Sequence, residues 1–132
     1  MEKEIVIKAE NVTKRFGERA ILNGVTLEIY KGEIFVIMGG SGCGKSTFLR
    51  HLIGALKPDS GRLHLLGRDI ASLSEDEMDK LKKRIGMSFQ SSALFDSMTV
   101  SENVALALKE HTKLDKSVID TVVKMKLELV GL

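Results

Sequence analysis

The feature that most constrains this chain is a glycine-rich segment, residues 39–46, with the sequence GGSGCGKS. It matches the phosphate-binding loop pattern G-x-x-x-x-G-K-[ST] at every fixed position. The preceding run, residues 34–38, is short, apolar and rich in β-branched residues, which is typical of a strand buried on both faces. The following residues, 44–56, carry apolar side chains at helical spacing. We therefore predict a core parallel strand, a phosphate-binding P-loop and a helix; the alternative is a glycine-rich turn that matches by chance.

The predicted loop can bind phosphate through its backbone. Glycines tolerate torsion angles that other residues avoid, so successive N–H groups can point inward and form an anion-binding concavity. The helix after the loop adds free N–H groups and the positive end of its dipole. Lys45 would contact the β- and γ-phosphates, and the Ser46 hydroxyl would bind Mg²⁺. The predicted ligand is a nucleoside triphosphate with Mg²⁺, held by Gly39, Gly40, Ser41, Gly42, Cys43, Gly44, Lys45, Ser46 and Thr47.

Cys43 is the single cysteine, so it cannot form an internal disulfide or a cysteine zinc site. It stands at a variable position of the loop. One interpretation is that it contributes only its backbone amide. The other is that its thiol lies close enough to bound phosphate for alkylation to block binding.

Hydrophobic periodicity outside the loop predicts an α/β fold. Apolar residues alternate in two stretches on either side of a turn at residues 14–17, which indicates a β-hairpin. Strands are expected at residues 5–9, 20–29, 34–38, 62–66 and 86–90. Ser74 with Glu77, and Thr99 with Glu102, each form a capping-box pattern, so helices should begin there. A last helix is expected at residues 115–129, with an apolar face of Val118, Ile119, Val122 and Met125.

Composition excludes some classes of function. The 20 basic and 18 acidic side chains leave a net charge of only +2, and the Lys and Arg residues form no block of five or more, which gives nucleic acid no electrostatic support. Apolar runs are far shorter than the roughly 20 residues that span a bilayer. The charged amino terminus, residues 1–4, does not resemble a secretory signal. We expect one modest domain in the cytosol, with no nucleic acid partner and no direct membrane insertion.

Several segments together resemble the ATP-binding subunit of ABC transporters. These are residues 14–17, the P-loop, residues 56–61 and residues 85–90, followed by residues 99–104. The resemblance covers virtually all of residues 1–132 and corresponds to the N-terminal part of a single ATP-binding domain. It implies an incomplete ABC-type P-loop NTPase fold, with an N-terminal antiparallel β subdomain, the P-loop strand and helix, the Q-loop and the start of the helical subdomain. Residues 91–100 and 127–132 are most similar to the ATPase of Mla-type phospholipid transporters, which work with MCE proteins.

The resemblance also implies roles for residues outside the P-loop. Phe16 matches the aromatic residue that stacks on adenine, where the family more often has tyrosine; a core aromatic is the alternative. Gln90 matches the Q-loop glutamine, which reaches Mg²⁺ and the attacking water; a solvated loop glutamine is the alternative. Lys45 and Gln90 are thus the implied catalytic residues, and Ser46 and Gln90 the implied metal ligands. Leu94, Phe95 and Met98 would receive a coupling helix of the membrane subunit, or would be ordinary core residues.

Other parts of the ABC ATPase machinery are not found in the sequence. There is no Leu-Ser-Gly-Gly-Gln signature, no Walker B strand ending in Asp-Glu and no switch histidine, because His51, His64 and His111 lie too early in the chain. Without the acidic general base, a rate contribution of about 10²–10⁴-fold is lost. We therefore expect this chain alone to bind ATP and to hydrolyse it negligibly.

The implied function is that of the energy-coupling ATPase of an ABC importer or lipid transporter of the bacterial envelope. In the complete system two such subunits form a homodimer around ATP and Mg²⁺, and they drive an ABC permease from the cytoplasmic face of the plasma membrane. The alternatives are a non-hydrolysing regulatory nucleotide-binding module and an inactive truncated fragment. A small P-loop kinase would need an arginine-rich lid, and a GTPase an Asn-Lys-x-Asp motif, and neither pattern occurs.

Overall fold

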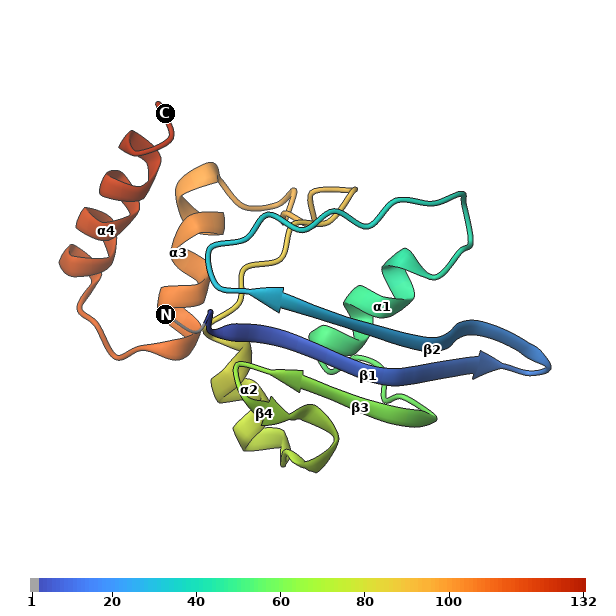
Figure 1. Cartoon of the computed structure of the whole chain (residues 1–132). Coiled ribbons are helices and arrows are strands. Elements are labelled where there is room, and N and C mark those ends of the chain that lie inside the picture. The colour runs from blue at the N-terminus through green and yellow to red at the C-terminus, as the bar shows by residue number, and fades with distance from the viewer. Residues whose placement is uncertain (1–2) are drawn as a thin grey trace. The chain divides into compact units, whose positions relative to one another are not determined.

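The computed structural model describes residues 3–132 (Figure 1). The chain divides into two compact units, Met1–Gly86 and Met87–Leu132. The first unit contains the sheet and the P-loop, and the second contains two helices. Within the described residues, no helix has both the length and the apolar character needed to cross a membrane.

An antiparallel sheet forms the first unit. Its strands are β1 (Ile5–Phe16), β2 (Arg19–Tyr30), β3 (Ser60–Leu65) and β4 (Arg68–Asp69), in the order β2-β1-β3-β4. The predicted hairpin is confirmed, but residues 14–16 belong to β1 and not to the turn. Phe16 pairs with Arg19, so the loop consists of two residues, and Gly17 takes a φ of +60° there. Such a two-residue loop suits the twist of an antiparallel pair.

A bulge in β1 places two core residues on the same face. Ala9 and Val12 are both buried, although strand alternation alone would put them on opposite faces. The register shifts between them, and Asn11 has a φ of +52°. The Asn11 amide donates to Thr26 Oγ1 at 2.9 Å, which fixes the bulge against β2. The extra residue therefore turns Val12 back into the core.

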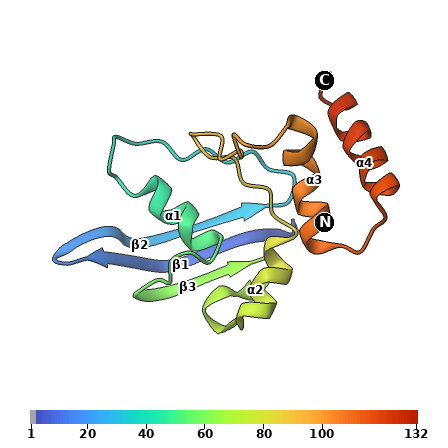
Figure 2. The same ribbon diagram turned by 180° about the vertical axis from the view of Figure 1, so that it is seen from behind.

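Helix α1 (Lys45–Leu52) lies across one face of this sheet, as Figure 2 shows. It is shorter than the predicted 44–56, because Gly54 has a left-handed φ of +70° and its N–H bonds the carbonyl of His51. The short 3₁₀ helix η1 (Ile70–Ser72) and helix α2 (Glu75–Lys82) follow β4. The predicted capping box of Ser74 and Glu77 is present in full. The common core consists of Ala9, Val12, Leu22, Phe48, Leu63, Leu65, Ile70 and Leu81.

The second unit pairs helix α3 (Val100–His111) with helix α4 (Lys116–Glu128). Thr99 and Glu102 form the predicted capping box, and Asp115 precedes α4 as its N-cap residue. The predicted apolar face of α4 is only partly right. Ile119 and Val123 are buried against α3, whereas Val118 and Met125 are exposed. Ile119 and Val123 are four residues apart, so they lie on the same face of α4.

Two predicted strands are not formed. Residues 34–38 have no strand pairing, and the exposed fraction of their side chains runs from 38% at Ile37 to 92% at Ile34. Residues 86–90 also lack strand structure. A strand needs a neighbouring strand to receive its backbone hydrogen bonds, and none of the described strands pairs with either segment. The prediction of a core strand at residues 34–38 is therefore wrong for this structure.

Candidate functional site

The P-loop begins a helix at the position that its sequence predicts. Residues 41–44 form a turn, and α1 starts at Lys45. Gly42 and Gly44 have φ values of +76° and +100°, which other residues rarely adopt. A Cβ on Gly44 would lie 2.8 Å from the carbonyl oxygen of Ile21 and 3.0 Å from Leu22 Cδ2. Glycine at this position therefore lets the loop pack directly against β2.

The Lys45 side chain folds back over the loop. Its ammonium group donates hydrogen bonds to the carbonyl oxygens of Gly39 and Gly40, at 2.7 Å each. The same nitrogen lies 3.5 Å from Sγ of Cys43, which is exposed. These contacts hold a positive charge beside the amino terminus of α1, where the helix dipole also favours an anion.

An open cavity of about 290 Å³ connects the P-loop with the tip of the hairpin. Its lining consists of Phe16, Arg19, Ile21, Gly42, Cys43, Gly44, Lys45, Ser46 and Thr47. Phe16 is far from the loop in sequence. It reaches the loop because it pairs with Arg19 across the hairpin turn, and Ile21, near the start of β2, lies against Gly44. The exposed fraction of Phe16 is 52%, so this side chain is not a core aromatic. The structure thus places an aromatic ring and the P-loop in one cavity.

An ion pair fixes the end of β1 that carries Phe16. Lys14 Nζ lies 2.7 Å from Asp59 Oδ1, and the Arg15 amide donates to Asp59 Oδ2 at 2.7 Å. Hydrogen bonding from Lys14, and then from the Arg15 amide, lowers the pKa of the Asp59 carboxyl below its usual value. Lys14 Nζ also lies 5.8 Å from the centroid of the Phe16 ring. The segment after α1 is thereby tied to the strand beside the cavity.

His51 occupies a buried position in α1 that its sequence context does not predict. It is fully buried, and its Nδ1–H donates to the carbonyl oxygen of Thr47 at 2.7 Å. Nε2 has no hydrogen-bond partner among the described residues. In α1 the buried residues are Phe48 and His51. Because histidine is a polar residue, its presence in a helix does not by itself predict burial.

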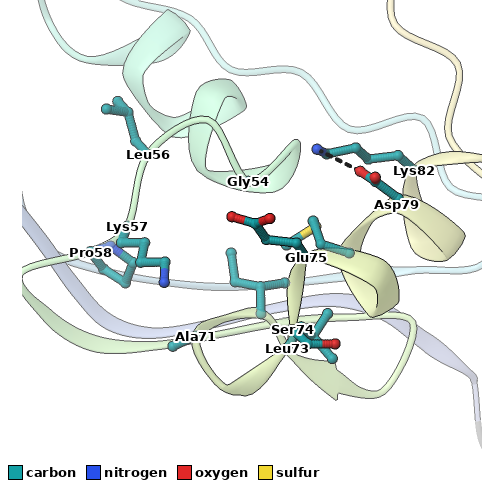
Figure 3. A pocket seen from close by; sticks show the side chains of 12 residues that line it. Gly54, Leu56, Lys57, Pro58, Ala71, Leu73, Ser74, Glu75, Asp79 and Lys82 are labelled. Atoms are coloured by element: carbon teal, nitrogen blue, oxygen red, sulfur yellow. Dashed lines mark hydrogen bonds and ion pairs between the residues drawn. The ribbon is translucent and has the colours of Figure 1, made fainter.

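A second cavity, of about 320 Å³, lies between the turn after α1 and helix α2 (Figure 3). Leu73 and Met78 contribute to its lining, and Lys82 and Asp79 form an ion pair at 3.2 Å on its α2 side. None of the predicted nucleotide-binding residues lines it. It also lacks a glycine-rich backbone that could cradle phosphate. The P-loop cavity is therefore the candidate functional site.

A family comparison agrees with this geometry. The model described as "ABC transporter" matches residues 22–130. The chain belongs to the ABC transporter family. The match begins inside β2 and continues through the P-loop into the second unit.

Relatives and solved structures support the ABC assignment. The chain is 43% identical to the Haemophilus influenzae intermembrane phospholipid transport system ATP-binding protein MlaF, over 96% of this chain and 48% of that protein. It is 44% identical to a probable ribonucleotide transport ATP-binding protein, mkl, of Mycobacterium leprae, over 97% of this chain and 37% of that protein. The solved ATP-binding cassette MJ0796, a dimer bound to ADP and Pi, is 32% identical with a TM-score of 0.82, over 96% of this chain and 57% of that one. The chain thus spans about half, or less, of these ABC proteins.

The implied Q-loop lies in the second unit. Gln90 is exposed in a turn, and Ser92 and Ala93 after it have left-handed φ values of +63° and +54°. Leu94 and Phe95 are also exposed, so within this unit they are not core residues, whereas Met98 is half-buried. The implied ABC roles of these residues stay predictions.

Asn103 holds the segment between the implied Q-loop and α3. Its side-chain oxygen accepts from the Phe95 amide at 2.9 Å, and Nδ2 donates to the carbonyls of Phe95, Met98 and Thr99 at 3.0–3.2 Å. One side chain therefore closes residues 95–99 into a loop. Asn103 belongs to residues 99–104, one of the segments that resemble ABC ATPases. Nothing in the sequence predicts the hydrogen bonds of its side chain.

The described residues offer Mg²⁺ few ligands of their own. They contain no group of three or more His, Cys, Asp or Glu that could hold a metal ion. Ser46 lines the P-loop cavity at the start of α1, and a serine hydroxyl is a hard oxygen ligand of the kind that Mg²⁺ accepts. Because Mg²⁺ is usually held by one or two protein groups together with substrate phosphates, this ABC cavity fits a metal that arrives with a nucleotide.

Proposed function

We propose that this chain binds MgATP in the P-loop cavity as part of the ATP-binding subunit of an ABC transporter. The observation that supports this most is that one cavity is lined by Phe16, by the left-handed glycines of the P-loop and by Lys45. Adenine would stack on the Phe16 ring, and the phosphates would accept from the loop amides. Lys45 would contact the β- and γ-phosphates, and Ser46 would bind Mg²⁺.

We propose that this chain binds ATP but lacks groups needed to hydrolyse it. No carboxylate lines the P-loop cavity, so the acidic general base expected of an ABC ATPase is not supplied there. Lys45 would stabilise charge on the phosphates and Gln90 would contribute to Mg²⁺ and water, while the base would come from residues outside this sequence. We therefore propose negligible hydrolysis by the chain alone. We also interpret the two compact units as parts of one ABC ATP-binding domain.

For the whole transporter, we propose lipid transport across the bacterial envelope. The support is the likeness to MlaF and the Mla-like residues 91–100 and 127–132, although mkl, with similar identity, is named for another substrate. A permease would dock on the exposed Leu94 and Phe95 at the cytoplasmic face of the membrane. A second ATP-binding subunit would complete a homodimer, as the dimeric form of MJ0796 suggests.

Calorimetric titration of the purified chain tests the proposed function. Wild-type protein should bind MgATP, and Lys45→Ala should lose most of the affinity because the phosphate charge is then unmatched. Lys57→Ala is the control, since Lys57 lines the other cavity and should not affect binding. Phosphate release should stay near background at saturating MgATP. Absence of binding by wild-type protein would reject the site, and sustained turnover would reject the separation of binding from hydrolysis.

A further inference from the structure

Arg19 is a cationic residue of the P-loop cavity to which the P-loop pattern assigns no role. It is exposed and lines the cavity together with Phe16 and the P-loop. Among the described residues, its guanidinium has no hydrogen-bond or ion-pair partner. The neighbouring cations differ: Lys14 pairs with Asp59, and an Arg15 guanidinium nitrogen donates to the carbonyl of Glu18 at 2.5 Å. Arg19 is therefore available to a ligand in the cavity.

The hairpin register places Arg19 between Phe16 and the P-loop, which both line the cavity. Across the turn it pairs with Phe16, the proposed adenine contact. Two residues further along β2, Ile21 contacts the backbone at Gly44. Two residues of a strand span roughly 7 Å. Along β2, Arg19 therefore lies beside Phe16, and it is Ile21 that lies against the P-loop.

We propose that Arg19 binds the α-phosphate of the nucleotide; this inference rests on the proposed function of the site. In a bound nucleotide the α-phosphate lies between the base and the β- and γ-phosphates. The base would be at Phe16 and the terminal phosphates at Lys45, so the α-phosphate is the group that comes nearest Arg19. A guanidinium presents paired N–H donors that match phosphate oxygens, and it stays charged at every relevant pH.

The test compares the binding of four ligands to the wild-type chain and to three variants of it. Wild-type, Arg19→Ala and Arg19→Lys proteins are titrated with MgATP, ADP, AMP and adenosine, by calorimetry for tight ligands and NMR shift titration for weak ones. Arg15→Ala is the matched control, since Arg15 is a cation of the same hairpin that does not line the cavity. Circular dichroism and the thermal midpoint check that each variant keeps its fold.

An α-phosphate contact gives a characteristic pattern of affinities. Arg19→Ala should weaken ATP, ADP and AMP by a similar factor of about ten, as expected for a charge-assisted hydrogen bond, and leave adenosine unchanged. Arg19→Lys should recover part of the loss, and Arg15→Ala should have no effect. A loss confined to ATP would overturn the assignment to the α-phosphate. Unchanged affinities in Arg19→Ala would overturn the contact itself, whereas wild-type protein that binds no MgATP would instead refute the proposed function.

Discussion

Ile21 and Gly44 pack backbone against backbone, with the carbonyl oxygen of Ile21 only 2.8 Å from the position that a Cβ of Gly44 would occupy. This contact joins the strand that follows the hairpin to the residue that precedes α1. The geometry of the P-loop therefore depends on the sheet as well as on its own glycines. It also explains how a loop matched by sequence comes to lie beside Phe16.

We expect Gly44→Ala to damage both stability and nucleotide binding. The new methyl group would clash with β2, and alanine at a φ of +100° is strained, which together cost about 1–3 kcal/mol of the free energy of unfolding. Urea denaturation and MgATP titration measure the two effects. Gly86→Ala is the control, because nothing lies within 4 Å of its added Cβ, its φ is not positive and it lies outside the P-loop. Equal behaviour of the two variants would contradict the importance of the Ile21 contact.

Phe16 should discriminate between ligands with and without a base. Phe16→Ala should weaken MgATP by about one to two orders of magnitude, since stacking of a base on an aromatic ring contributes about 1–3 kcal/mol. Phe16→Tyr should bind like wild type because the ring is retained. Tripolyphosphate, which has no base, should bind all three proteins equally. If tripolyphosphate loses as much affinity as ATP in Phe16→Ala, the residue acts on the loop and not on adenine.

The ion pair of Lys14 and Asp59 predicts a defined pH dependence. The pKa of Asp59 is lowered from 3.8 in the folded state, so its contribution to stability is full above the unfolded value. That contribution is lost as the pH falls through the lower folded pKa. The difference in the free energy of unfolding between wild type and Asp59→Asn should therefore be present near neutral pH and vanish in strong acid. Urea denaturation along a pH series measures it.

Lys14→Met provides the matched control for this pH effect. Without the ammonium group, the Arg15 amide is the remaining donor to the carboxylate, so the effect of Asp59→Asn should be smaller in that background. A double-mutant cycle isolates the coupling of the two residues. A pH-independent difference would show that the carboxylate acts through its shape or its neutral hydrogen bonds.

Asn103→Ala should loosen residues 95–99 without unfolding α3. The side chain accepts from the Phe95 amide and donates to three carbonyls, and alanine replaces none of these bonds. Hydrogen exchange at the Phe95 amide should accelerate, while amides within α3 keep their protection. The change in overall stability should be about 1 kcal/mol, the usual net contribution of a hydrogen bond. Unchanged exchange at Phe95 would remove Asn103 as the clamp of this loop.

The parts of the fold that sequence predicted well depend on local signals. The P-loop is specified by its own residues, and the capping boxes at Ser74 and Thr99 need only contacts within one turn of helix. The bulge at Asn11 could not be predicted, because it depends on how β1 meets β2 and β3 in three dimensions. The apolar run at residues 34–38 was misassigned for the same reason. Its composition favours a strand, but a strand is completed by neighbours that local pattern cannot supply.

The candidate site was likewise predictable only in part. The P-loop motif identified six of the nine residues that line the cavity, and the family resemblance supplied Phe16. Of the predicted residues, Gly39, Gly40 and Ser41 are not among the lining. Arg19 escaped notice because an arginine near a hairpin turn is ordinary in sequence. Only the register, which pairs it with Phe16, and the Ile21 contact with Gly44 place it in the cavity.

Cys43 offers a chemical test of the loop that needs no change to the phosphate-binding residues around it. Its thiol is exposed, and Sγ lies 3.5 Å from the ammonium group of Lys45, which would contact the β- and γ-phosphates. Alkylation with N-ethylmaleimide should therefore abolish MgATP binding by steric exclusion, and bound MgATP should slow the modification. Cys43→Ser should bind MgATP normally and resist the reagent. Modified wild-type protein that keeps its full affinity would show that Cys43 contributes only its backbone amide and that its side chain lies outside the phosphate site.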